Sequence, residues 1–226
     1  MKKALSLIAV FLVAVMWSST GFSAEKYVSG NIGISWFNDI DLGYTYEGEG
    51  EDFTQKAEMG SGIALTGAFG CDYGDFRTEL ELGYQSSDVE NLIWIDDGDE
   101  LDLGAEGEDI SGDVSVTSLM ANGYYDIDLG GIELFLTAGV GVAQIDIDDI
   151  DYTEGDFVYN ASETTLAYQL GAGFGIPVSD NIMLDARYRY FATTDATISG
   201  GIGPIGLDGN GNVESHSALI GLRVGL

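Results

Sequence analysis

The stretch at residues 165–191, TLAYQLGAGFGIPVSDNIMLDARYRYF, decides the fold because its side chains alternate between two kinds. On either side of PVSDN (residues 177–181), one parity is apolar and the other is polar, charged or glycine. Successive side chains of a β-strand point to opposite faces, so each arm predicts a strand with one apolar face. Pro, Ser, Asp and Asn favour chain reversal, and the two arms therefore predict a hairpin.

The polar face of this hairpin indicates which class of β protein it belongs to. Gly171, Gly173 and Gly175 share that face with Arg187 and Arg189. Glycine inside a strand usually marks a close approach or a bend, which a solvated sheet face does not require. A narrow polar interior and an apolar exterior facing lipid explain both features. The hairpin therefore predicts a transmembrane β-barrel.

The composition narrows the cellular context. Residues 1–24 begin with Lys2 and Lys3 and continue with an apolar run and small residues, which predicts a cleaved secretory signal peptide and a barrel domain at 25–226. The formal net charge of -30 argues against nucleic acid as a partner. Cys71 is the single cysteine, so no internal disulfide can form.

The same alternation recurs along the rest of the chain and predicts eight strands. Acidic or glycine-rich segments at about 38–60, 86–112, 146–163 and 193–212 separate them in alternation with short turns. This order of long and short connections predicts an all-β, eight-stranded antiparallel up-and-down transmembrane barrel. We expect the long segments to be extracellular loops and the termini to be periplasmic.

Several stretches carry a resemblance to a known family. They are YVSGNIGISWFND, FRTELELGYQ, SLMANGYYDID, LTAGVGVAQIDID, LAYQLGAGFGIPVSDNIMLDARYRYF and HSALIGLRVGL. Together they resemble the outer-membrane β-barrel family that includes opacity proteins, small surface antigens and the membrane domain of OmpA-like proteins, here without a C-terminal peptidoglycan-binding domain. Relatives usually end in an aromatic residue that the barrel-assembly machinery reads, whereas this chain ends in Leu226.

The resemblance implies a place in the outer membrane of a Gram-negative bacterium and a role at the cell surface. Its implied surroundings are outer-membrane lipid and lipopolysaccharide, with the barrel-assembly machinery as a partner during biogenesis. Host or cell-surface ligands are further candidate partners. A narrow diffusion pore or gated channel is the alternative function.

Charged residues at inward positions form the first candidate site. All four arginines have inward parity, together with several carboxylates, and a charge in a narrow lumen is costly unless it is paired. We therefore expect a lumen charge network with ion pairs across the barrel. Its predicted members are Arg77, Glu79, Glu81, Glu133, Asp185, Arg187, Arg189 and Arg223. Such a network would either plug the barrel or act as a gate for small ions.

Two further chemistries are weaker candidates. Loop aspartates could supply oxygen ligands to calcium or magnesium, although a solvated, self-repelling surface is the favoured explanation of them. These weak metal candidates are Asp96, Asp97, Asp99, Asp146, Asp148, Asp149 and Asp151. His216 is the only histidine, and Ser215 and Ser217 have the opposite parity, out of reach for a Ser–His relay. A lipid-modifying enzyme therefore ranks third, and we expect no catalysis and no dedicated cofactor.

Overall fold

The computed structural model describes residues 24–45, 52–96, 99–102, 111–151, 159–202 and 205–226. The predicted signal peptide lies outside these ranges, apart from Ala24. None of the described residues forms a helix long and apolar enough to span a bilayer. The described strands are β1 (Glu25–Phe37), β2 (Ile40–Thr45), β3 (Asp52–Met59), β4 (Ser61–Asp72), β5 (Phe76–Asp96), β6 (Asp99–Asp102), β7 (Ser111–Asp128), β8 (Glu133–Asp151), β9 (Tyr159–Ser179), β10 (Ile182–Thr193), β11 (Ala196–Ile202), β12 (Ile205–Gly211) and β13 (Glu214–Gly225).

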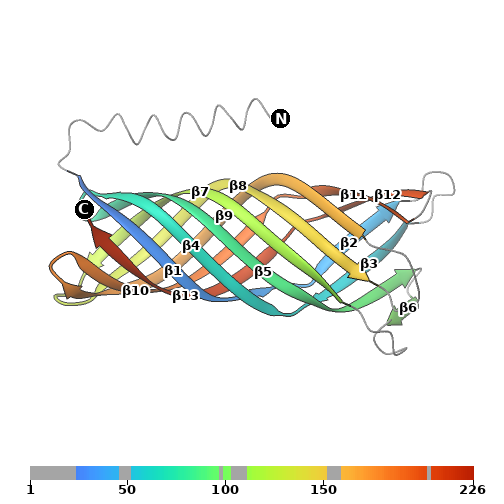
Figure 1. Cartoon of the computed structure of the whole chain (residues 1–226), viewed down its shortest axis with the longest axis horizontal. Coiled ribbons are helices and arrows are strands. Elements are labelled where there is room, and N and C mark those ends of the chain that lie inside the picture. The colour runs from blue at the N-terminus through green and yellow to red at the C-terminus, as the bar shows by residue number, and fades with distance from the viewer. Residues whose placement is uncertain (1–23, 46–51, 97–98, 103–110, 152–158, 203–204) are drawn as a thin grey trace, which may run out of the picture.

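Eight of the described strands close into a barrel, as Figure 1 shows. They pair antiparallel in the ring order β1, β4, β5, β7, β8, β9, β10, β13. The ring closes because β13 pairs back onto β1, from Gly225 opposite Tyr27 to Ser215 opposite Phe37. The predicted eight-stranded antiparallel barrel is confirmed.

One end of the barrel carries Glu25, Leu226 and the tight turns between β4 and β5, β7 and β8, and β9 and β10; we call it the terminal end, and the opposite one the distal end. Gly74 has a φ of 99°, which favours glycine, and its amide donates to Asp72 Oδ1 at 2.8 Å. Gly130, with a φ of 78°, makes the same kind of turn. The reversals predicted from the sequence form here.

The barrel wall has the polarity expected for a membrane protein. Its outward side chains are apolar and exposed, with Leu82 at 60% and Ile220 at 62%. Its inward side chains include fully buried charged residues such as Glu81 at 0%. A soluble barrel shows the reverse arrangement, so the parity read from the sequence corresponds to the two faces of the wall.

The segments predicted as long loops differ from the structure, because much of their described length is β-strand. β2, β3, β6, β11 and β12 lie in them, and β5, β8 and β9 run well past the predicted strand ends. Figure 1 places these parts together at the distal end, and we call them the distal extension. The sequence Ile145-Asp146-Ile147-Asp148 shows the physical reason. Its alternation has period two, so it continues a strand while the polarity of the two faces reverses.

This reversal fills the distal interior with apolar side chains. On β8, Ile145 and Ile147 are buried, although they continue the inward parity that carries polar groups nearer the terminal end. They belong to one cluster with residues of six other strands and with Val213, which lies between β12 and β13. We call this cluster the apolar plug: Phe37, Ala57, Val89, Val114, Val116, Met120, Ala143, Ile145, Ile147, Ala167, Phe191 and Val213.

Candidate functional site in the barrel interior

An ion pair crosses the lumen between β5 and β10, which are opposite each other in the ring. Arg187 Nη2 lies 2.9 Å from Glu81 Oε2, and both side chains are almost completely buried. The two side chains meet because Glu81 and Arg187 both occupy inward positions on facing strands. The contact joins residues 106 positions apart in the sequence. It therefore ties two sides of the barrel to each other through its centre.

A hydrogen-bonded chain extends this pair to the wall at β7, β5 and β1. Arg187 Nη1 donates to the Tyr124 hydroxyl at 2.8 Å, and that hydroxyl donates to Glu79 Oε2 at 2.6 Å. Ser29 Oγ donates to the other oxygen of the same carboxylate at 3.3 Å. Glu79 thus has a partner for each of its oxygens in a region from which bulk water is largely excluded.

Arg189 is held more loosely than Arg187. Its Nη2 donates to Gln85 Oε1 at 2.9 Å, whereas its Nη1 is 3.8 Å from Glu81 Oε1. Gln169 donates to the same Glu81 oxygen at 3.1 Å. Two guanidinium groups therefore share the Glu81 carboxylate, and loss of either arginine changes the environment of the other.

A second set of ion pairs lies nearer the terminal end. Arg77 makes a two-pronged contact with Asp126, at 2.6 Å and 2.7 Å. Arg223 contacts Glu133 at 2.5 Å and Asp185 at 3.2 Å. Planar, bidentate contacts of this kind are the strongest form of guanidinium–carboxylate pairing.

Aromatic rings pack against the Arg77 guanidinium in this second set. The centre of the Tyr124 ring is 4.5 Å from Arg77 Cζ, and that of Phe135 is 5.3 Å away. A cation over a desolvated ring gains electrostatic attraction. The rings also occupy space beside the guanidinium, so the terminal half of the lumen is packed as well as charge-paired.

The structure brings all eight sequence-predicted charges into the interior, in two connected sets. Five carboxylates and four guanidinium groups take part, so the interior is nearly neutral although the chain carries a net charge of -30. Sequence reasoning missed Asp126, Tyr124, Gln85 and Gln169. Their inward parity was readable, and their polarity at buried positions was the available signal.

The free volume described beside part of this network is small. A cavity beside Arg77, Glu79, Tyr124 and Arg187 measures about 10 Å³, which is about the volume needed to admit one water molecule. Beyond the charge network, on the distal side, lies the apolar plug. The described interior therefore holds two layers of side chains, one ionic and one apolar.

His216 lies on the outside of the barrel. Its Nδ1 is 2.6 Å from the Tyr188 hydroxyl, and the two rings stack at 5.9 Å. Ser215 and Ser217 are completely buried on the inner side, where Ser217 Oγ accepts from Arg189 Nη2 at 3.4 Å. The wall of the barrel therefore separates the histidine from both serines, and this geometry gives no Ser–His relay.

The weak metal candidates are only partly within the described structure. Asp97 lies outside the described residues, and of the others the side-chain environment is described for Asp146 alone. Both oxygens of Asp146 accept from Gln144 Nε2, at 3.0 Å and 3.1 Å. In the part of the chain that the structure describes, no three His, Cys, Asp or Glu side chains are grouped so that they could hold a metal ion.

Comparison with known proteins shows the family. The family described as outer membrane protein beta-barrel domain matches residues 5–224. The chain belongs to this family. It is similar to outer membrane protein PagN of Salmonella typhimurium strain LT2, with 26% identity over 214 residues that cover 85% of this chain and 84% of PagN.

Two solved structures share the fold of this outer-membrane barrel. OprG from Pseudomonas aeruginosa superposes with a TM-score of 0.56 and 16% identity, covering 91% of this chain and 98% of OprG. Neisserial surface protein A superposes with a TM-score of 0.52 and 18% identity, covering 89% of this chain and 97% of the Neisserial chain. At these identities the likeness shows the fold alone, because one fold carries many functions. Membership of the family places the chain in the outer membrane, so the exposed apolar wall contacts lipid.

Proposed function

We propose that the chain is a non-catalytic surface protein of a Gram-negative outer membrane, with a structural, adhesive or cell-surface interaction role. The termini and short turns face the periplasm, and the distal extension stands outside the cell. The observation that carries the proposal is the filled interior, in which the charge network and the apolar plug occupy successive layers of the lumen. A barrel filled in this way offers its distal extension, not its lumen, to other molecules.

The distal extension supports this role because it is built as a water-facing sheet. Its inward residues Val114, Val116 and Ile145 are buried, whereas outward residues such as Asp88 and Glu90 are exposed. A sheet with an apolar inner face and an acidic outer face suits water on the outside. Such an acidic surface is repelled by the phosphates of lipopolysaccharide, so it remains accessible to host or cell-surface ligands.

Orientation can be tested directly on intact cells. In a Cys71→Ser background, a cysteine at Asp88 should react with a membrane-impermeant maleimide, and one at Leu129 in a terminal turn should react only after the outer membrane is opened. Cells displaying the protein should then be compared with cells displaying a variant with Asp88, Glu90 and Glu163 made neutral, for attachment to host epithelial cells. Labelling of the cysteine at position 129 on intact cells would mean that the orientation is the opposite of the proposed one. If cells displaying the wild-type protein attach no better than cells lacking it, the adhesive role is wrong and a structural role remains.

A gated channel is the second candidate function, and one observation favours it. Among the described residues, Gln85 Nε2, Asn122 Nδ2, Gln169 Oε1 and Arg187 Nε are buried without a hydrogen-bond partner. Buried polar groups are normally satisfied, so water molecules inside the lumen would meet these needs. A hydrated network would rearrange more easily and could admit small ions.

A further inference from the structure

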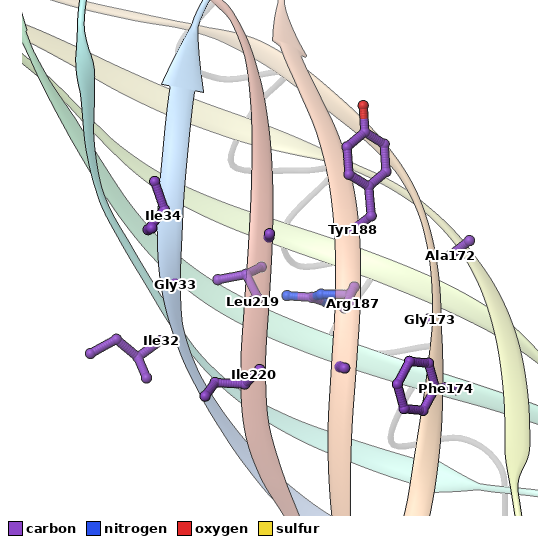
Figure 2. Close-up of a pocket in the computed structure, with 12 residues that line it drawn as sticks. Ile32, Gly33, Ile34, Ala172, Gly173, Phe174, Arg187, Tyr188, Leu219 and Ile220 are labelled. Atoms are coloured by element: carbon purple, nitrogen blue, oxygen red, sulfur yellow. The ribbon is translucent and has the colours of Figure 1, made fainter.

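A hollow of about 710 Å³ lies on the lipid-facing side of the barrel, across β9, β10, β13 and β1. Figure 2 shows Ile32, Ile34, Ile220 and Phe174 around it. The floor is low because Ala172, Ala186 and Ala218 occupy outward positions between these larger side chains. The hollow is continuous with the wall that contacts lipid, so acyl chains are the apolar partners available to it.

Polar and aromatic side chains border this hollow on its distal side. Ala218 pairs with Tyr188, and the next outward residue of β13 toward the distal end is His216, hydrogen-bonded to the Tyr188 hydroxyl. The Tyr190 ring centre lies 5.3 Å from that of His216. In Figure 2 the Tyr188 hydroxyl extends beyond the hollow, along the strands. A chain in the hollow would thus leave it beside a cluster of aromatic rings, a hydroxyl and an imidazole.

The charges around this cluster indicate the kind of head group. The four arginines point into the lumen, and Lys56 is paired with Asp39, 2.9 Å away. Glu214, one outward step beyond His216, is a carboxylate that accepts from Asn38 and Asn212 at 3.1 Å each. Carboxylate, amide and aromatic groups suit the hydroxyls and ring faces of a sugar, whereas a phosphate requires cations.

We propose that this hollow is a binding site for one glycolipid of the outer leaflet. An acyl chain fills the space over Ala186 and Ala218, and a sugar of the head group contacts His216, Tyr188 and Tyr190. The inference rests on the proposed function in one respect, which is that the distal end faces the outer leaflet. The site would hold one lipid on one side of the barrel.

Native mass spectrometry of the whole barrel protein tests the site. The protein is reconstituted into vesicles with equal amounts of dephosphorylated lipid A, which keeps the sugars and acyl chains, and phosphatidylglycerol, then returned to detergent and examined for retained lipid. The wild type should retain one dephosphorylated lipid A. Ala186→Phe and Ala218→Phe fill the floor and should lower retention about tenfold, which corresponds to the loss of roughly two buried methylene contacts. Ala121→Phe, an outward substitution on β7, is the matched control and should retain the lipid.

A second variant separates the head group from the acyl chain. Tyr188→Phe keeps the ring and removes the hydroxyl, so the preference for dephosphorylated lipid A over phosphatidylglycerol should fall about fivefold while total lipid retention persists. Three results would each overturn the site. They are equal retention of the two lipids by the wild type, equal retention of the glycolipid by the wild type and Ala186→Phe, and a protein dimer that carries no lipid. The cysteine labelling described above is independent of this readout, so failure of the site is distinguishable from failure of the proposed orientation.

Discussion

Replacement of Arg187 by Ala should destabilise the barrel strongly. The change removes the 2.9 Å ion pair with Glu81 and the 2.8 Å hydrogen bond to Tyr124. Glu81, which is 0% exposed, would keep a 3.1 Å hydrogen bond from Gln169, and its remaining guanidinium, that of Arg189, is 3.8 Å away. Removing one partner of a buried pair costs about 3–5 kcal/mol elsewhere, because the other charge stays buried without full compensation.

The assay is equilibrium urea unfolding of the purified barrel in detergent or lipid, followed by tryptophan fluorescence and by the heat-dependent shift of mobility on gels. With an m-value of about 2 kcal/mol/M, a loss of ~4 kcal/mol lowers the urea midpoint by roughly 2 M. Arg187→Met, Glu81→Gln and the double variant complete a thermodynamic cycle. The double variant should be less destabilised than the sum of the two, since neither charge is then left alone. An unchanged midpoint for Arg187→Ala would refute the reasoning, because it means that water already screens these charges.

Three further outcomes are expected. Ile145→Ala should cost about 2–5 kcal/mol of unfolding free energy by leaving a cavity in the apolar plug, whereas Gln144→Ala on the outer face should change it by less than about 0.5 kcal/mol; equal effects would mean that the plug is not packed. A spin label at Leu184 should be relaxed by oxygen dissolved in lipid, while one at Asp88 should be relaxed by a water-soluble nickel complex; water accessibility at both would contradict the lipid-facing assignment. If the acidic segments bind divalent cations, millimolar calcium should protect the distal extension from proteolysis more than sodium does at the same ionic strength, and equal protection would leave the acids as a solvated surface.

The fold could be predicted from the sequence because the parity of side chains along a strand is a local property. Each strand of the membrane-facing wall shows its outward and inward sets within about ten residues, and the glycines and arginines of the hairpin at 165–191 show which set is inside. The same parity placed Arg187 and Glu81 in the lumen. It did not show that Arg189 shares Glu81, since this depends on which rotamers fit together in the centre of the barrel.

The distal extension was missed for a different reason. Acidic residues and glycines are the usual composition of loops, so segments such as 146–163 were interpreted as irregular. Their apolar residues nevertheless alternate with the acids, as in Ile145 and Ile147, and the buried face is the one that points inward. Reading parity without assuming that the outer face must be apolar would have predicted both the longer strands and the apolar plug.

Single-channel recording in a planar bilayer tests the central claim, that the barrel is filled, most directly. The wild-type barrel should insert without stable conductance steps, because the ion pair between Glu81 and Arg187 crosses the lumen and the apolar plug fills the interior beyond it. A variant with Glu81 and Arg187 both replaced by Ala, together with Ile145→Ala, should conduct if these side chains are what fills the passage. Stable, ohmic conductance steps from the wild-type protein would contradict the account and establish the channel instead.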